Sequence, residues 1–167
     1  MVGAYARFVE RDRMSAITGF EDFSVGQVFT SLASGPVDAV AIKAFAAQFD
    51  TQAQHMDEAA AVHTLFGRLV ASGWHTASLT MRLLLDSALS GVSGRGMGVK
   101  VHGIDWSAPV CAGDSLHAVS EVMEVRPSRS KPDRGLVVLR TETRNQRDEK
   151  VQELTSTLLF LRSDAVI

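Results

Sequence analysis

One stretch of this sequence combines an acid, an imidazole and a helix start at a spacing that could support proton-transfer chemistry. Asp50 precedes His55 by five residues, and Ser72-Gly73 follows at the expected start of a nearly uncharged helix. A carboxylate and an imidazole can exchange protons near neutral pH, and the free N–H groups of a helix N-terminus can stabilise an oxyanion. Together these groups suit the addition of water to, or its removal from, a carbon chain activated by a thioester.

The composition is that of one globular domain and argues against several classes of protein. A chain of 167 residues can build one sizeable core but not two ordinary ones. The formal net charge of −2 provides no electrostatic footprint for nucleic acid. The single cysteine, Cys111, cannot form an internal disulfide, which favours a small buried thiol and a reducing, cytoplasmic location.

The N-terminal segment does not resemble a targeting signal, and the most apolar stretch does not resemble a membrane span. Residues 1–18 are expected to be an N-terminal extension, and residues 1–13 mix acidic and basic side chains without the apolar core of a secretory signal. The most apolar stretch, 69–89, contains His75, Arg82 and Asp86. Such interruptions indicate a buried helix, so we expect no contact with a membrane.

Helical patterns predominate between residues 37 and 89. Apolar spacing over 37–49 predicts a helix that ends near Asp50, and a second short helical piece is expected at 57–62. Ser72 is a suitable N-cap for a helix running to about Leu89, whose faces are nearly all apolar or small. Asp50 should therefore lie at a helix-to-loop junction, where its carboxylate can turn into a cleft.

The remaining segments have the alternation and turn residues of β-strands. Strands are expected at 26–32, 98–106, 115–126, 135–145 and 151–161. Long antiparallel strands with one buried helix inserted before them predict an α+β hotdog fold, a curled sheet wrapped around a long central helix, over residues 19–163. The open edge of such a sheet is usually covered by another strand, so a homodimer is the expected minimum.

These features resemble the MaoC-like hydratase/dehydratase family. Its (R)-specific enoyl-CoA hydratases carry an aspartate five residues before a histidine and a glycine near the start of the central helix. The similarity is densest at 45–85 and extends to the stretch 106–114 and the hairpin 126–135. One departure is that many of these hydratases have Asn-Pro between the two catalytic residues, whereas this chain has Gln52-Ala53.

The resemblance implies a role for each residue of the motif. Asp50, with its pKa raised by the cleft, would act as general base on a water that attacks C3 of a trans-2-enoyl thioester, and His55 would orient that water. The N–H of Gly73 would donate to the enolate oxygen. Further contacts with the substrate are expected from Ser72, Trp74 and Gln52. The reaction requires no metal or redox cofactor, and coenzyme A enters as part of the substrate.

A cluster of basic residues on the predicted hairpin has two interpretations. Such a group is most often a solvated turn, but it could also bind the phosphates of coenzyme A. The candidate phosphate contacts are Arg129, Lys131 and Arg134, with Arg126 beside them.

The other large polar and aromatic residues have structural interpretations. His75 is expected to be a core histidine with a backbone partner. A tryptophan at such a position is more often packed in the core, but Trp74 could instead lie in the wall of an acyl tunnel, which would give it the expected contact with the substrate. No metal site is predicted, because the remaining histidines, His63, His102 and His117, have no partner at the spacing of metal ligands.

Two other functions are compatible with the same predicted fold. A hotdog acyl-CoA thioesterase would need an acid on the central helix, and this helix holds none before Asp86. A non-catalytic acyl-CoA-binding subunit would keep the fold and lose the acid-imidazole pair. The presence of both Asp50 and His55 therefore favours a hydratase.

Overall fold

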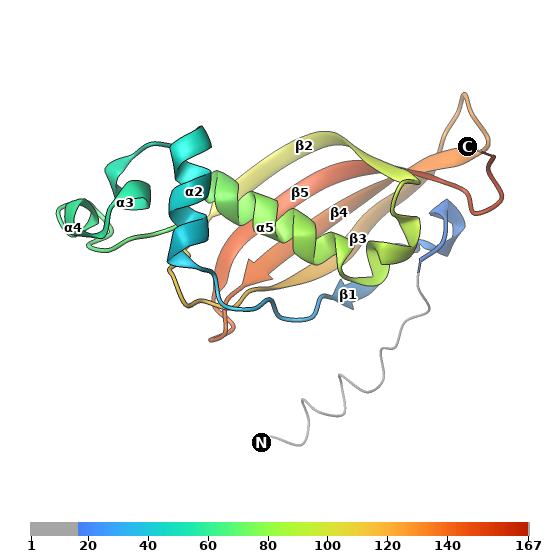
Figure 1. Ribbon diagram of the computed structural model, residues 1–167. Helices are drawn as coiled ribbons and strands as arrows, with labels where there is room; N and C mark the ends of the chain where they lie inside the picture. The colour runs from blue at the N-terminus through green and yellow to red at the C-terminus, as the bar shows by residue number, and fades with distance from the viewer. Residues whose placement is uncertain (1–16, 167) are drawn as a thin grey trace, which may run out of the picture.

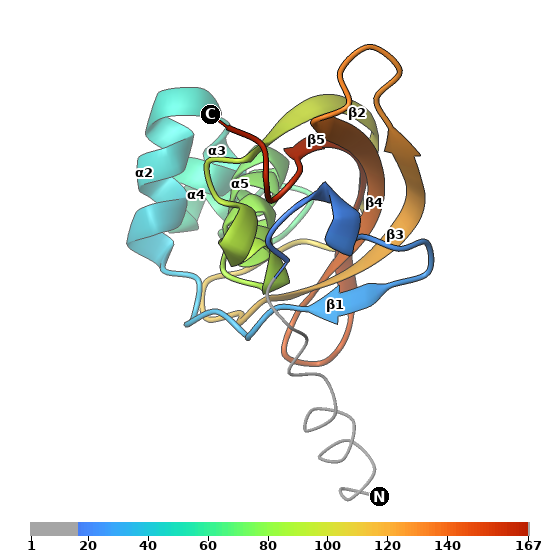
Figure 2. The same cartoon turned by 90° about the vertical axis from the view of Figure 1, so that its right-hand side faces the viewer.

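The computed structural model describes residues 17–166 and confirms the expected α+β architecture. A five-stranded antiparallel sheet of order β1-β3-β4-β5-β2 curls around one long helix, α5 (Gly73–Leu85), as Figure 1 shows. Seen end-on in Figure 2, the sheet wraps one side of the helix, with β1 and β2 as its two edges. The strands are β1 (Val28–Thr30), β2 (Gly96–Trp106), β3 (His117–Pro127), β4 (Arg134–Arg144) and β5 (Lys150–Leu161).

Short helices precede α5 in the chain and gather at its N-terminal end (Figure 1). They are α2 (Ala39–Phe49), α3 (Ala53–Met56) and α4 (Glu58–Ala61). Asp38 caps α2 by accepting from the Val40 N–H at 3.1 Å, and Asp57 caps α4 by accepting from the Ala60 N–H at 2.8 Å. Two 3₁₀ turns, η1 (Phe20–Asp22) and η2 (Ala88–Val92), lie near the C-terminal end of α5 (Figure 1).

The central helix ends four residues earlier than the predicted end at Leu89. The Ser87 hydroxyl donates to the Leu84 carbonyl at 2.5 Å and accepts from the Leu89 N–H at 3.4 Å. A serine that bonds to nearby backbone groups in this way competes with the helical hydrogen-bond pattern. The chain therefore leaves α5 at Asp86 and forms η2.

Two buried clusters hold the sheet to the helix. One cluster, which includes Phe23, Leu84 and Phe160, fills the end of the sheet beneath η1 and η2, and the rings of Phe23 and Phe160 stack at 4.6 Å. The other joins α2 to α5 through Ile42 and Leu83. An outer row of α5, made by Trp74, Met81 and Leu85, stays uncovered in the single chain, at 60%, 45% and 48% exposure. The sheet therefore covers only part of the helix that it was expected to wrap.

A chain of buried polar side chains links α5 to the sheet near its N-terminal end. The indole N–H of Trp106 donates to Oε1 of Gln152 at 2.9 Å, and Nε2 of Gln152 donates to the Thr80 hydroxyl at 2.9 Å. The Thr80 and Thr143 hydroxyls are 2.6 Å apart. Since Gln152 and Thr80 are fully buried, each bond replaces one that water would otherwise supply.

Replacing the amide in this chain should destabilise the fold measurably. In Gln152→Leu the Trp106 N–H loses its acceptor, so the free energy of unfolding should fall by about 1–3 kcal/mol. Urea denaturation followed by circular dichroism measures this change. The matched control is Gln48→Leu on exposed α2, which should change stability by less than about 0.5 kcal/mol. Equal stabilities for the two variants would contradict the role given to the buried amide.

The described part of the chain begins in the core of the domain. Most of the predicted N-terminal extension, residues 1–16, lies outside the described residues, whereas Ile17 is buried in the core at 1% exposure. Within residues 17–166 no helix is both long enough and apolar enough to cross a membrane.

Candidate active site

The carboxylate of Asp50 is fixed at the junction where α2 ends, as the sequence predicted. Asp50 is the C-cap residue of α2, and its N–H donates to the Ala46 carbonyl. One carboxylate oxygen, Oδ2, accepts from the Ser72 hydroxyl at 2.6 Å. The other, Oδ1, accepts from Nε2 of Gln52 at 2.8 Å. The acid is therefore held in one orientation by two side-chain donors, one on each oxygen.

The imidazole of His55 lies beside this acid and is 5% exposed. Its Nδ1–H donates to the Val70 carbonyl at 2.8 Å, because a carbonyl oxygen can only accept. In the neutral ring Nε2 then carries a lone pair, and it faces Oδ2 of Asp50 at 3.5 Å. Two acceptors so placed can share one water molecule that donates to both, which leaves the lone pairs of that water free for attack.

The structure corrects the expected direction of the Asp50 pKa. The Ser72 hydroxyl, above all, holds the pKa of Asp50 below its ordinary value, and the Gln52 amide and the nearby His55 act in the same direction. Partial burial raises the pKa of Asp50; its effect is smaller than that of the Ser72 hydroxyl, although larger than that of Gln52 or His55. Donors to a carboxylate stabilise its charged form, so Asp50 is an ionised base throughout the neutral range.

Removal of the strongest of these donors should move the acidic limit of activity. A base is lost as the pH falls through its pKa, so in Ser72→Ala the acid limb of the kcat/KM profile should shift to higher pH than in the wild type. The matched control is Ser78→Ala, whose hydroxyl donates to a backbone carbonyl of α5. Profiles of kcat/KM against pH measure the shift, and superimposable acid limbs for Ser72→Ala and wild type would show that the hydroxyl does not set the Asp50 pKa.

The N-terminus of α5 lies directly beside the acid-imidazole pair. Ser72 caps the helix by accepting from the Trp74 N–H at 3.3 Å, while its own hydroxyl proton goes to Asp50. The N–H of Gly73 is the first of the helix and has no acceptor within it. Its position at the positive end of the helix dipole suits it to stabilise a developing negative charge.

Glycine is required at position 73 because an aromatic ring packs against its backbone. A Cβ added to Gly73 would lie 2.7 Å from the indole ring of Trp106. Trp106 is in turn held by Gln152, and it meets Trp74 edge-on with ring centroids 5.4 Å apart. In the sequence, Trp106 begins the stretch 106–114 that resembles the family, but no pattern there indicates its role. Its contact with Gly73, which positions the start of α5, is visible only in the structure.

These groups line one cavity of about 410 Å³. Its polar atoms come from the acid-imidazole pair and the helix start, and its apolar wall is formed by Phe66, Val70, Trp74, Trp106, Pro109 and Val110. Phe66 and Gln54 were not expected here; Gln54 donates to Oε1 of Gln52 at 3.0 Å. A mostly apolar cavity with a few converging polar groups is typical of a small-molecule site.

The structure decides between the two interpretations of Trp74 and corrects the one given for His75. Trp74 is 60% exposed and lines the cavity, which is the wall position that was the alternative to core packing, and its contact with the substrate stays a prediction. His75 is a buried histidine, but its Nδ1 has no partner among residues 17–166, and its ring stacks on Phe45 at 4.8 Å instead. Burial lowers the pKa of His75, which keeps this ring neutral.

The basic hairpin is not brought to the cavity by the fold of the single chain. It connects β3 to β4 at the end of the sheet where Gly135 pairs with Phe160, whereas the cavity lies where Trp106 pairs with Gln152. In Figure 1 the hairpin rises at the end opposite α2, α3 and α4. Arg129, Lys131 and Arg134 therefore lie at the opposite end of their own sheet from Asp50.

The thiol and the other histidines contribute nothing to the cavity. Cys111 is half-buried, and burial raises the pKa of its thiol, which disfavours the reactive thiolate. His102 contacts the Thr157 hydroxyl and His117 contacts Asp148. Among residues 17–166 no three His, Cys, Asp or Glu side chains are grouped so as to hold a metal ion.

The curled sheet, its central helix and this cavity define a hotdog-fold protein with the parts of a hydratase/dehydratase site. Residues 22–145 match the model of the MaoC like domain, and the chain belongs to that family.

Similar proteins match this chain over most of their length. A MaoC-like dehydratase from Rhodospirillum rubrum is 46% identical, with a TM-score of 0.78 over 85% of this chain and 95% of that one. The (R)-hydratase from A. caviae involved in PHA biosynthesis is 28% identical, with a TM-score of 0.65 over 83% and 97% of the two chains. The uncharacterized protein YdeM of Bacillus subtilis (strain 168) is 30% identical over 85% of this chain and 98% of its own.

Proposed function

We propose that this protein adds water reversibly to a trans-2-enoyl thioester, such as an enoyl-CoA, to give the (3R)-hydroxyacyl thioester. One observation carries the proposal: Asp50 and His55 present two acceptors 3.5 Å apart in a cavity that also contains the start of α5. Asp50 and His55 can hold and deprotonate a water, and the start of α5 can stabilise the enolate that results. The (R)-hydratase and the dehydratase similar to this chain support the same assignment.

The proposed reaction requires one base, one proton delivery and one oxyanion site. Asp50 takes a proton from the bound water while the water oxygen bonds to C3, and the π electrons of the C2–C3 bond move toward the thioester oxygen. The N–H of Gly73 donates to that oxygen and lowers the energy of the enolate. The proton that Asp50 took then passes to C2, so that the base is restored and the sum is addition of one water, while His55 keeps the water oriented. Dehydration is the same path reversed.

The ionised state of Asp50 fits this direction of proton transfer. A general base must be unprotonated at the working pH, and the donors from Ser72 and Gln52 ensure that it is. The same bonds leave each carboxylate oxygen one further lone-pair direction for the water. Ser72 and Gln52 thus position the base, and both also line the cavity, so the substrate contacts expected of them stay predictions.

The structure gives less support to the two alternatives. A thioesterase with its acid on the central helix is disfavoured because α5 contains no Asp or Glu from Gly73 to Leu85. A purely acyl-binding protein has no need of an acid held by two donors beside an oriented imidazole. One assay distinguishes both of these functions from that of a hydratase.

That assay follows two signals from crotonyl-CoA at once, the enoyl-thioester absorbance of the substrate and the release of free thiol. Hydration removes the enoyl-thioester absorbance without releasing thiol, and this is the expected result. Release of free thiol would instead identify a thioesterase. If neither signal changes for crotonyl-CoA or for a panel of longer enoyl-CoA substrates, the hydratase proposal fails.

We further propose that the working protein is a homodimer joined at the open edge of the sheet. β2 pairs only with β5 among the described strands, and it carries the exposed apolar side chains of Met97, Val99 and Val101, at 61%, 53% and 59% exposure. At one end of β2, Trp106 meets Trp74 of the uncovered row of α5. An open apolar edge of this kind is normally covered by another strand. Sedimentation should therefore show a dimer or a multiple of it at micromolar concentration, and a stable monomer would contradict this.

A further inference from the structure

One buried side chain, that of Gln152 on β5, connects the two elements that meet at the start of the central helix. Its Oε1 accepts from the indole N–H of Trp106, on β2, at 2.9 Å. Its Nε2 donates to the Thr80 hydroxyl, on α5, at 2.9 Å. Since Gln152 is fully buried, water from the surface cannot replace either bond. Gln152 therefore ties the Trp106 ring to the central helix at a set distance.

The orientation of this amide is determined by its partners. An indole N–H can only donate, so the oxygen of the amide must face Trp106 and its nitrogen must face Thr80. The Thr80 hydroxyl then accepts from Gln152 and donates to the Thr76 carbonyl at 2.9 Å. In the remaining contact, at 2.6 Å, the Thr143 hydroxyl must donate to that of Thr80. This buried polar chain, from Trp106 to Thr143, has one arrangement of donors and acceptors and holds its members in one geometry.

Both sides of the Gln152 amide bear on Gly73, whose N–H is proposed to bind the enolate oxygen. The Trp106 ring packs directly on Gly73, with 2.7 Å between the ring and a Cβ built there. Thr80 follows Gly73 by seven residues within α5, which is about two turns, so the two residues lie along one face of the helix. A displacement of the Gln152 side chain would thus change where the Gly73 N–H points.

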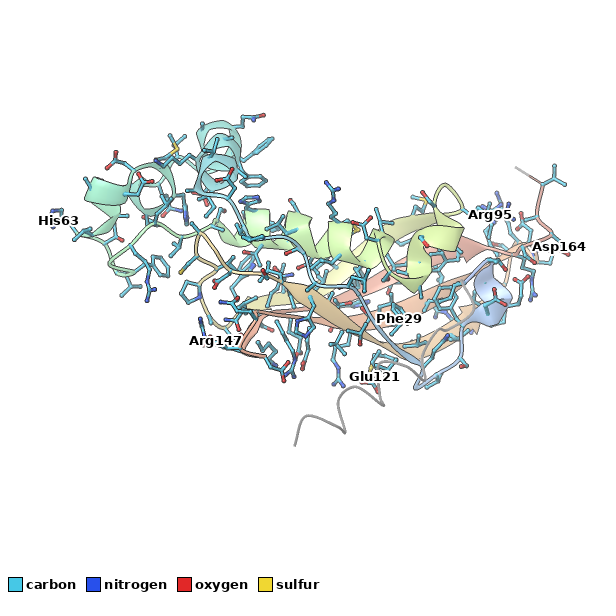
Figure 3. The ribbon with its side chains drawn as sticks, turned by 60° about the horizontal axis from the view of Figure 1, so that its bottom comes forward. Phe29, His63, Arg95, Glu121, Arg147 and Asp164 are labelled. Carbon is cyan, nitrogen blue, oxygen red and sulfur yellow. The ribbon has the colours of Figure 1, made fainter. Side chains whose placement is uncertain are left out.

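The strand register explains how a residue of the last strand reaches this site. Gln152 pairs with Trp106 across β5 and β2. In Figure 3, Arg147, which precedes β5, lies in the half of the molecule that contains His63, whereas Asp164, which follows β5, lies at the opposite end. The first residues of β5 therefore lie at the same end of the sheet as the cavity.

We propose that Gln152 is a positioning residue for hydration: it holds the Trp106 ring against Gly73 and so aims the Gly73 N–H at the thioester oxygen. Gln152 is not one of the residues that line the cavity, so it acts through Trp106 and not on the substrate. This inference rests on the proposed hydratase function. Without the amide, the indole loses its acceptor, the ring can turn, and the oxyanion donor loses its fixed position.

The first test replaces the amide and follows both turnover and the bond to the thioester. In Gln152→Leu, kcat for crotonyl-CoA should fall by about 10-fold while KM changes by less than about 2-fold, because the donor matters most when charge develops on the oxygen. In the slow Asp50→Asn background, infrared difference spectra should show the C=O stretch of bound crotonyl-CoA moved toward its frequency in solution when Gln152→Leu is added. A folded Gln152→Leu with the kcat of the wild type would overturn the proposal.

The matched control separates positioning from a general loosening of the core. Thr141→Val removes another buried hydroxyl bond of the sheet, that between Thr141 and Ser120 at 3.0 Å, and leaves the buried polar chain intact. We expect the kcat of Thr141→Val to equal that of the wild type. An equal loss of kcat in Thr141→Val and Gln152→Leu would mean that Gln152 has only a structural role, which contradicts the proposal.

A conservative variant provides a test by rescue. In Gln152→Glu a protonated carboxyl group can accept from Trp106 and donate to Thr80, as the amide does. Burial raises the pKa of such a carboxyl group, and its ionised form can neither donate to Thr80 nor tolerate negative charge on the enolate oxygen. The kcat of Gln152→Glu should therefore approach that of the wild type at acidic pH and fall as the pH rises through the raised pKa. Folded Gln152→Glu that is as slow as Gln152→Leu at every pH would count against the proposal.

A measurement without substrate tests the link from Gln152 to Gly73. Wild type and Gln152→Leu are labelled with ¹⁵N-glycine, and the amide signal of Gly73 is assigned by its loss in Gly73→Ala. The ring of Trp106 shifts the magnetic resonance of the amide on which it packs, so this signal should move in Gln152→Leu and stay in place in Thr141→Val. If it does not move in Gln152→Leu, the proposal is wrong. If it moves but the wild type hydrates no enoyl thioester, the link to Gly73 stands and the hydratase function fails.

Discussion

Asp50→Asn should lower kcat by roughly 10²–10⁴-fold while the fold survives. The amide keeps the shape of the carboxylate and can still accept from the Ser72 hydroxyl, but it cannot take a proton from water. The loss should therefore be chemical and not structural. Steady-state kinetics on an enoyl thioester that the wild type turns over measures the effect, with circular dichroism to confirm folding. The matched control is Asp38→Asn, since asparagine caps a helix as well as aspartate does and Asp38 lies outside the cavity.

The imidazole provides a further check on the same pair. His55→Ala should cost a similar factor, because the water would lose its second acceptor. If the two residues act as one unit, the double variant should lose much less than the product of the two single losses. Near-normal turnover by folded Asp50→Asn would place the base elsewhere and would require the mechanism to be abandoned.

Gly73→Ala should also lower kcat strongly, by about 10²-fold. The added methyl group would lie 2.7 Å from the Trp106 ring, so the helix start or the ring must move, and the oxyanion donor moves with it. Gly35→Ala is the matched control, because a Cβ there meets nothing within 4 Å. Trp106→Phe in the Gly73→Ala background makes room for the methyl group and should recover part of the activity. Kinetics unaffected by Gly73→Ala would mean that this backbone does not approach the substrate.

Local chemistry explains why much of the fold was predictable from the sequence. The alternation of β3, β4 and β5 and the Ser72 cap are properties of neighbouring residues, and they placed the strands and the start of α5 correctly. The end of α2 at Asp50 follows in the same way, because the apolar spacing stops there. The early end of α5 was missed because it depends on two hydrogen bonds of the Ser87 side chain.

The details of the site depend on residues far apart in the chain, which spacing does not reveal. The direction of the Asp50 pKa was wrong because a cleft was expected to desolvate the acid, whereas donors from Ser72 and Gln52 outweigh desolvation. The contact of Trp106 with Gly73 joins β2 to α5 and has no local pattern. The distance of the hairpin from the cavity likewise follows from strand register, which the sequence did not specify.

The fate of the oxygen atom of water tests the central claim most directly. Crotonyl-CoA is incubated with the wild-type protein in H₂¹⁸O, and the products are analysed by mass spectrometry and chiral chromatography. We expect intact (3R)-hydroxybutyryl-CoA with ¹⁸O at C3, formed far more slowly by Asp50→Asn. Appearance of ¹⁸O in a free carboxylate together with released coenzyme A would contradict the hydratase mechanism, since water would then have attacked the thioester carbonyl and not C3.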